Sequence, residues 1–82
     1  MKAYINIITK TGTALRVVKR LRQQDREVLS ADALYGRFDA VCVIQAGQLE
    51  DLDKIVYDVI QSDPNVLRTE TSIVLGFKTD IQ

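Results

Sequence analysis

Residues 28–46, VLSADALYGRFDAVCVIQA, contain two apolar runs joined by the tetrapeptide Gly36-Arg37-Phe38-Asp39. Both runs have the composition of β-strands, so this stretch predicts a hairpin. A tight strand-to-strand turn needs a residue that is free to take a positive φ, and Gly36 would supply it. Asp39 is unusual at the start of so apolar a strand. Its carboxylate either accepts a hydrogen bond within the turn or is kept for a ligand.

The chain before this hairpin predicts a strand and a helix. Residues 2–9 alternate and are rich in aromatic and β-branched types, which indicates a strand. Thr13 follows a Thr-Gly break, and its hydroxyl is placed to accept an unpaired N–H of the first helical turn. The helix ends in the polar segment 24–26. Its apolar stripe recurs at helical spacing and consists of Ala14, Val17, Val18 and Leu21.

The hairpin and the residues after it predict two strands and a second helix. The second strand covers residues 27–35, and one of its faces carries Leu29, Ala31, Ala33 and Tyr35. The third covers residues 40–46 and is apolar on both faces. The second helix follows Gly47-Gln48 and ends before Pro64, which disfavours helical geometry at the preceding residue. Its apolar stripe comprises Leu49, Leu52, Val56 and Val59, widened by Ile55 and Ile60.

A last strand over residues 66–75 completes a βαββαβ order, which is the pattern of a ferredoxin-like plait in the α+β class. Right-handed crossovers place both helices on one face of a four-stranded antiparallel sheet, with the first and third strands in its centre. The chain of 82 residues has room for one domain, residues 1–82. One face of the last strand carries Leu67, Thr69, Thr71, Ile73 and Leu75.

The face of the sheet that the helices leave open is too apolar to face water. It would carry one side of the first strand and one side of residues 40–46, and neither side of the latter is polar. The candidates on the first strand are Tyr4, Asn6 and Ile8, or Ala3, Ile5 and Ile7. A second copy of the same sheet is the simplest cover, so we expect an isologous homodimer.

Composition excludes several classes of function. Eleven basic and eleven acidic residues cancel, so the chain lacks the net positive charge of a nucleic-acid-binding protein. Histidine is absent, which excludes the usual zinc-binding sets and the nucleophile systems that depend on histidine.

The chain shows no sign of a membrane or secretory segment. No apolar run reaches the ~18–20 residues of a membrane span, and residues 1–8 are too short for a signal peptide. Cys42, the single cysteine, lies in an apolar run, which is typical of a buried thiol in the core. A single cysteine forms no disulfide framework within the chain, which favours a cytoplasmic protein. We expect no cofactor and no metal.

Two charged clusters have structural explanations. The basic residues Arg16, Lys19 and Arg20, with Arg22 and Arg26 nearby, are typical of a solvated helix face, because no aromatic residues are interleaved for base stacking. The acidic residues Glu50, Asp51 and Asp53 lie where a helix dipole favours negative charge. Capping explains them better than a hard-metal site does.

Asp39 and the run Thr69-Glu70-Thr71-Ser72 are the remaining candidates for a site. Thr69 and Thr71 share one face of a strand because the side-chain period is two. Hydroxyls near a carboxylate suit a ligand that carries both ammonium and carboxylate groups. The same residues also fit a structural role, because threonine is a good strand former and Asp39 could cap its own turn.

The arrangement resembles the effector domain of the Lrp/AsnC family of feast/famine regulators, also called the RAM domain, over roughly residues 2–76. The matching segments are the opening Ala-Tyr-Ile-Asn-Ile strand, the Gly36-Arg37-Phe38-Asp39 turn, the acidic start of the second helix and the closing strand from Val66 to Leu75. The resemblance implies a non-catalytic domain of transcription regulators whose sheet packs on a twin, forming a dimeric α/β barrel. It also implies that dimers gather into octameric or decameric rings.

The same resemblance implies an amino-acid effector bound in clefts between subunits. The turn is expected to hold the α-amino and carboxylate groups, and hydroxyls of the last strand are expected to come from a neighbouring subunit. Carried over by position, the ligand-binding residues are Gly36, Arg37, Phe38, Asp39, Thr69, Thr71 and Ser72. One or two pocket side chains would decide which amino acid is the effector.

The chain also departs from the family pattern. Full-length regulators carry a helix-turn-helix before this domain, whereas here Met1 directly precedes the first strand. We therefore expect a stand-alone form, or a cut piece of a longer regulator, that does not bind DNA alone but could mix with full-length relatives. Two alternatives remain, namely a purely structural oligomerisation module and a small dimeric α/β-barrel enzyme of the monooxygenase or cyclase kind. The absence of histidine and of a tuned acid–base pair argues against the enzyme.

Overall fold

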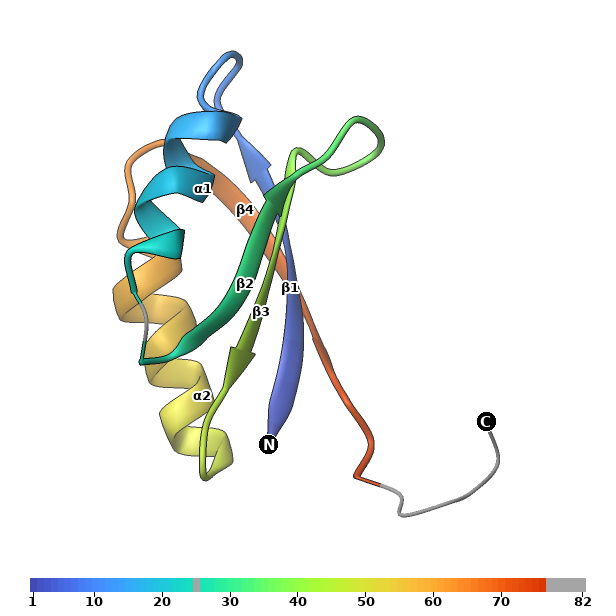
Figure 1. Cartoon of the computed structure of the whole chain (residues 1–82), viewed down its shortest axis with the longest axis vertical. Coiled ribbons are helices and arrows are strands. Elements are labelled where there is room, and N and C mark those ends of the chain that lie inside the picture. The colour runs from blue at the N-terminus through green and yellow to red at the C-terminus, as the bar shows by residue number, and fades with distance from the viewer. Residues whose placement is uncertain (25, 77–82) are drawn as a thin grey trace.

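The fold is a four-stranded antiparallel sheet with two helices on one face. The computed structural model describes residues 1–24 and 26–76. Along the chain the elements are β1 (Lys2–Thr9), α1 (Ala14–Arg22), β2 (Val28–Ala33), β3 (Ala40–Gln45), α2 (Leu49–Ile55), its continuation η1 (Val56–Gln61), and β4 (Val66–Ile73). The strand order β2-β3-β1-β4 puts β1 and β3 in the centre (Figure 1). The βαββαβ order and the antiparallel sheet confirm the predicted plait.

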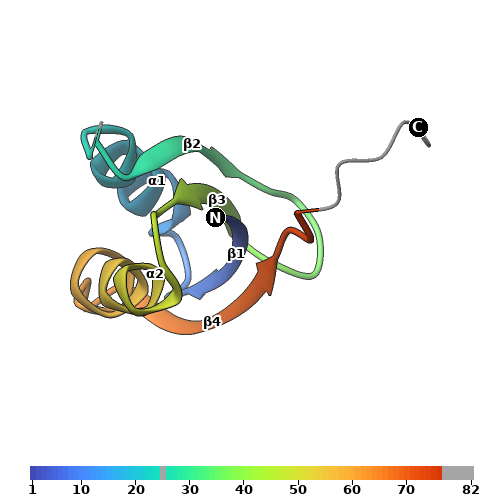
Figure 2. The same ribbon diagram turned by 90° about the horizontal axis from the view of Figure 1, so that it is seen from below.

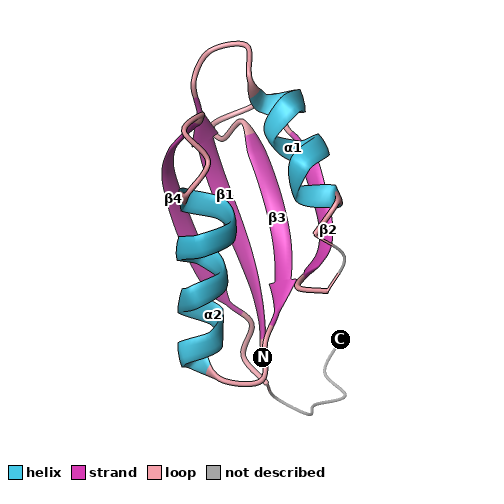
Figure 3. Cartoon of the chain, turned by 90° about the vertical axis from the view of Figure 1, so that its left-hand side faces the viewer, coloured by secondary structure: helices cyan, strands magenta, loops and turns pink. Residues whose placement is uncertain are grey.

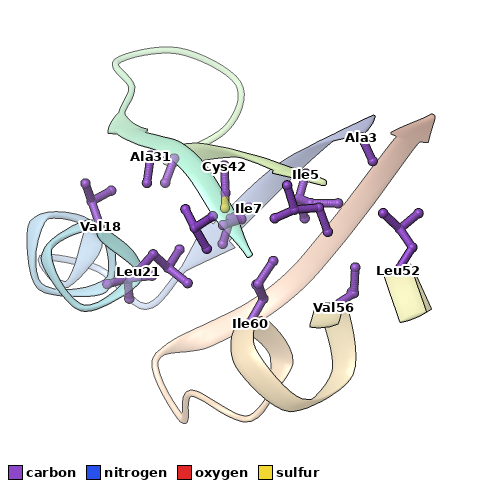
Figure 4. Packing of buried hydrophobic residues seen from close by; sticks show 14 residues of the cluster. Ala3, Ile5, Ile7, Val18, Leu21, Ala31, Cys42, Leu52, Val56 and Ile60 are labelled. Atoms are coloured by element: carbon purple, nitrogen blue, oxygen red, sulfur yellow. The ribbon is translucent and has the colours of Figure 1, made fainter. Parts of the chain in front are cut away.

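The helices cover one face of a curved sheet, as Figures 2 and 3 show. Ala3, Ile5 and Ile7 of β1 are fully buried under them. The opposite side of β1, with Tyr4, Asn6 and Ile8, therefore belongs to the open face. The rest of the core comes from β2, β3, α1 and the second helix (Figure 4), and its largest buried side chains are Leu21, Ile44, Leu52, Ile60, Val17 and Cys42.

The first helix buries most of its predicted stripe but starts differently. Val17, Val18 and Leu21 are buried, as predicted, whereas Ala14 is only partly buried. The expected Thr13 cap is wrong, because its hydroxyl donates to the Lys10 carbonyl at 2.6 Å and makes no cap to the helix. Thr13 has φ −111° and ψ 0°, which is not the extended geometry of a capping residue. The helix ends at Arg22, and Asp25 of the predicted terminating segment lies outside the described residues.

The second helix changes its geometry at Val56, where α-helical turns give way to the π-helical segment η1. A wider i→i+5 turn displaces the stripe that a 3.6-residue period predicts. After Leu52 and Val56 the fully buried residue is therefore Ile60, and Val59 is only partly buried. Leu49, also expected in the core, is the first residue of α2 and is 48% exposed. The helix ends at Gln61, before Pro64, as predicted. Neither helix among the described residues is long and apolar enough to cross a membrane.

The second strand is shorter than predicted and contains a bulge. The pairing of β2 with β3 shifts between Val28 and Ser30, which leaves Leu29 54% exposed while Val28 and Ala31 are buried. The predicted face through Leu29 is wrong because one extra residue at a bulge reverses the alternation. The strand ends at Ala33, and Tyr35 belongs to the loop that follows. At the other edge, β4 ends at Ile73, two residues before the predicted end.

Candidate functional site

The β2–β3 connection, residues 34–39, projects beyond the sheet (Figure 1). It is closed by a hydrogen bond from the Leu34 N–H to the Asp39 carbonyl at 2.8 Å. Gly36 does not take a positive φ, and Gly12 is the glycine that does so among the described residues. The prediction of a tight turn with Gly36 at a positive φ is therefore wrong. The longer loop over residues 34–39 reverses the chain direction without a left-handed residue.

Asp39 is held at the boundary between this loop and the centre of the sheet. Its N–H donates to the Ile7 carbonyl at 2.9 Å, and its carboxylate Oδ2 accepts the Thr9 N–H at 2.8 Å. The side chain thus satisfies a backbone donor where the β1–β4 pairing shifts between Ile8 and Thr9. Within the described part of the chain no donor is bonded to Oδ1. The Asp39 carboxylate therefore has a structural role as a hydrogen-bond acceptor, and its Oδ1 stays available for a second donor.

A groove of about 390 Å³ lies beside Asp39, and we call it the loop groove. Its other wall is the β1–α1 connection, which includes Lys10. An ammonium and a carboxylate therefore border one groove, and this pairing matches the two charges of a free amino acid. Its lining residues are Thr9, Lys10, Thr11, Gly12, Ala14, Leu15 and Asp39. Lys10 was missed from the sequence, although a basic residue directly after a strand and before a Thr-Gly-Thr break was a signal.

The other nominated loop residues lie outside the loop groove. Arg37 is exposed and its guanidinium carbon lies 5.5 Å from the centre of the Phe38 ring, a cation–π contact. Phe38 is half-buried. A Cβ added to Gly36 would meet no atom within 4 Å. Nothing in the described part of this chain therefore requires a glycine at position 36.

The polar residues of β4 are divided between the two faces of the sheet. Thr69 and Thr71 stand opposite Ile7 and Ile5 and so share the helix-covered face, as the period of two predicted. Ser72 stands opposite Tyr4 on the open face. The structure therefore separates Ser72 from the two threonines with which the sequence grouped it.

A second groove, of about 470 Å³, lies between β4 and the second helix, and we call it the β4 groove. Gln61 donates from Nε2 to Thr69 Oγ1 at 2.8 Å across it. Its lining residues are Asp53, Val56, Tyr57, Gln61, Thr69 and Thr71. The sequence analysis did not identify Asp53, Tyr57 and Gln61 as candidate site residues, and it assigned Asp53 to helix capping. Their four-residue spacing, which places them on one side of a helix, is the signal that could have identified them.

One chain does not unite the two halves of the nominated site. The loop groove and the β4 groove share no residue. Asp39 precedes β3, whereas Thr69 and Thr71 lie on β4, and β1 separates these strands in the sheet. No groove of the described chain therefore brings Asp39 and the two threonines together.

The charged clusters are partly engaged within the chain. Arg20 donates from Nε to Asp63 Oδ2 at 2.7 Å and also contacts the Val59 carbonyl at 2.6 Å. Burial opposes the charge on Asp63, yet the Asn65 N–H and Arg20 hold the pKa of this carboxyl below its ordinary value. Arg22 is bonded to the Ala31 carbonyl at 2.7 Å. Among the described residues, no group of three or more Asp, Glu, His or Cys is placed to hold a metal ion.

The Lrp/AsnC ligand binding domain matches residues 2–79. The chain belongs to this family. This confirms the resemblance that the turn and the closing strand indicated. No curated protein sequence matches the chain.

Solved structures share the fold of this chain. FFRP-DM1 is 28% identical with a TM-score of 0.82, and the alignment covers 90% of this chain and 97% of that one. A hypothetical protein of Pyrococcus horikoshii is 26% identical with a TM-score of 0.83, covering 99% and 96%. A transcriptional regulator of Neisseria meningitidis, solved as an L-Met complex, is 23% identical with a TM-score of 0.79, covering 99% of this chain and 51% of that one.

The fold of this RAM domain also occurs in an enzyme. A 5-chloro-2-hydroxyhydroquinone dehydrochlorinase of Burkholderia phenoliruptrix shares 9% identity with a TM-score of 0.62, covering 92% of this chain and 94% of that one. At this identity the likeness concerns the fold alone. The plait by itself therefore does not distinguish a ligand-binding domain from an enzyme.

Proposed function

We propose that this protein is a non-catalytic, amino-acid-binding assembly domain in which each effector molecule is held between two chains. The ligand-binding role of its family supports the first part. The observation that carries the second is that Asp39 and the β4 threonines line separate grooves in one chain. A neighbour that presents its 34–39 loop to the β4 groove completes a single site.

The charges at the loop groove suit the invariant part of an amino acid. Asp39 Oδ1 is available for the α-ammonium, while Oδ2 stays on the Thr9 N–H. The Lys10 ammonium, on the other wall of the groove, attracts the α-carboxylate. The open space around Gly36 lets the backbone of the loop approach a ligand or a neighbouring chain closely. Arg37, which is exposed, and Phe38, which is half-buried, belong to the same loop.

The open face of the sheet supports a homodimer. Tyr4 is 42% exposed, and Ile8, Val41 and Val43 around it remain only partly buried. These side chains occupy the two central strands, where an apolar patch in water is unfavourable. A second copy, packed sheet to sheet, covers the patch and gives the dimeric α/β barrel. Ser72, on the same face, would then lie at the dimer interface rather than at the effector.

The effector site must form between such dimers, because the β4 groove lies on the helix side that the sheet-to-sheet contact leaves uncovered. Binding of an effector between dimers favours the larger assembly by linkage. The octameric or decameric rings expected from the resemblance are assemblies of this kind. In the cytoplasm the domain would signal by joining rings with full-length regulators, which supply the DNA contact.

The test is a titration of the common amino acids by calorimetry, with light scattering on the same samples. At least one amino acid should release or absorb heat and increase the mean mass of the assembly. Asp39→Asn should lose this binding, because it removes the charge but keeps an oxygen for the Thr9 N–H. Glu50→Gln, an exposed change of the same kind, is the control and should bind like the wild type. Heat that is equal for all three proteins contradicts the assigned role of Asp39.

A purely structural oligomerisation module is the second candidate, and the Asp39–Thr9 hydrogen bond favours it. This bond explains the carboxylate without any ligand. The same titration separates the two candidates. Absence of heat and of any change in mass with every amino acid would support the structural module.

A further inference from the structure

We infer that the effector is an amino acid whose side chain ends in a hydrogen-bond donor, either a carboxamide or a cation. This inference rests on the proposed function and names the class of ligand for that site. If the loop groove of one chain holds the α-ammonium and α-carboxylate, the side chain of the ligand extends into the β4 groove of its neighbour. The chemistry of the β4 groove then selects the side chain.

The helix wall of the β4 groove is polar because of where the π-helical segment begins. Asp53, Tyr57 and Gln61 are spaced by four residues and all line the groove. In an α-helix each step of four residues overshoots a full turn by about 40°, so a polar line soon rotates away. The wider turns of η1, from Val56 onward, offset this drift. The three side chains therefore stay aligned beside β4.

Hydrogen bonding within the groove leaves acceptors free. The Gln61 amide donates from Nε2 to Thr69 Oγ1 at 2.8 Å, so its carbonyl Oε1 is left to accept. The Asp53 carboxylate accepts only, and no ion pair joins it to another residue of the described chain. A ligand side chain with N–H groups satisfies both Asp53 and Gln61.

Charge and polarity argue against the other classes of side chain. Asp53 is the only charged residue lining the β4 groove in the described chain, so an acidic side chain would meet repulsion there. Val56 is the one aliphatic residue of the wall and is itself buried. An aliphatic ligand would remove water from Asp53 and Gln61 without replacing their hydrogen bonds, which is costly.

The test is calorimetric titration of the full chain with L-glutamine, L-lysine, L-leucine and L-glutamate. The affinity for glutamine or lysine should exceed that for leucine and glutamate by about tenfold or more. Asp53→Asn should weaken the binding of the preferred ligand by about tenfold, and by more for lysine than for glutamine. Asp58→Asn is the matched control, because Asp58 lies on the same helix but lines a different groove. It should leave the affinity unchanged.

The outcomes separate this inference from the proposed function. Tighter binding of leucine or glutamate that still depends on Asp39 would overturn the inference and leave the proposed function standing. Equal effects of Asp53→Asn and Asp58→Asn would also overturn it. If no amino acid binds at all, both fail together. Circular dichroism spectra that match the wild type establish that each variant is folded.

Discussion

The Asp39 carboxylate accepts the backbone N–H of Thr9 at 2.8 Å, which joins the start of β3 to the end of β1. The bond lies just beyond the last β1–β3 pair, Ile7 with Ala40, so the side chain replaces a backbone partner for the Thr9 N–H. A residue proposed to bind a ligand is therefore also part of the fold. Variants of Asp39 must be chosen so that these two roles can be separated.

Replacing Asp39 with alanine should destabilise the protein, whereas replacing it with asparagine should not. Thr9 is 7% exposed, so an unpaired N–H there would cost about 1–3 kcal/mol. Asparagine keeps an acceptor oxygen in the same place. Urea unfolding of the three proteins, at equal chain concentration, measures the difference. Equal stability of the alanine variant and the wild type would show that this bond contributes nothing.

The ion pair between Arg20 and Asp63 should make stability depend on pH in the acidic range. The folded pKa of Asp63 lies below its ordinary value of 3.8. The stabilisation is therefore complete above 3.8 and is lost as the pH falls through the folded pKa. Asp63→Asn should reduce the free energy of unfolding by about 1–2 kcal/mol at neutral pH, since Arg20 is partly exposed.

Unfolding from about pH 7 to about pH 3 measures this effect, and Asp63→Asn should flatten the acidic part of the curve. Asp32→Asn is the control, because Asp32 pairs with Arg22 at 3.1 Å on the surface. It should change stability by no more than about 0.5 kcal/mol. An equally steep acidic fall in wild type and Asp63→Asn would contradict the assignment.

The bulge in β2 predicts opposite results for two adjacent residues. Val28 is buried and Leu29 is 54% exposed, so Val28→Ala should cost about 1–3 kcal/mol and Leu29→Ala about 0.5 kcal/mol or less. Thermal unfolding of both variants checks the register directly. A larger loss of stability for Leu29→Ala than for Val28→Ala would contradict the bulge and support the regular strand that the sequence predicted.

A charge on the open face should prevent dimerisation. Val43 stands opposite Tyr4 in the middle of that face, so Val43→Glu would bury an unpaired carboxylate in a sheet-to-sheet interface. Light scattering should then report monomers. Leu49→Glu, on an exposed part of the helix layer, is the control and should keep the mass of the wild type. A Val43→Glu protein that still forms dimers would show that the dimer interface does not include this face.

The fold was predictable from the sequence because strong apolar periodicity marks each element and Pro64 marks a helix end. The errors have local causes. The bulge at Leu29 interrupts the two-residue period of a strand, and the π-helical segment after Ile55 interrupts the 3.6-residue period of an α-helix. No residue pattern in the sequence marks either interruption. The length of the 34–39 loop removed the need for a left-handed residue at Gly36.

The site was only partly predictable, since it depends on which residues the tertiary structure brings together. Thr69 and Thr71 could be placed on one face by counting, and the same counting separates Ser72 from them. Asp53 and Gln61 required the position of the helix over β4, which no local pattern encodes. Lys10 required the close approach of the β1–α1 connection to Asp39.

The most direct test of a site between chains is complementation of two defective variants. Asp39→Asn removes the charge from the loop half, and a Thr69→Val, Thr71→Val double variant removes hydroxyls from the β4 half. Each protein alone should fail to bind the amino acid that the wild type binds. Unfolded and refolded together, they should regain part of the binding heat, because some sites then combine an intact loop with an intact groove. A mixture that binds no better than either variant alone would contradict a site shared between chains.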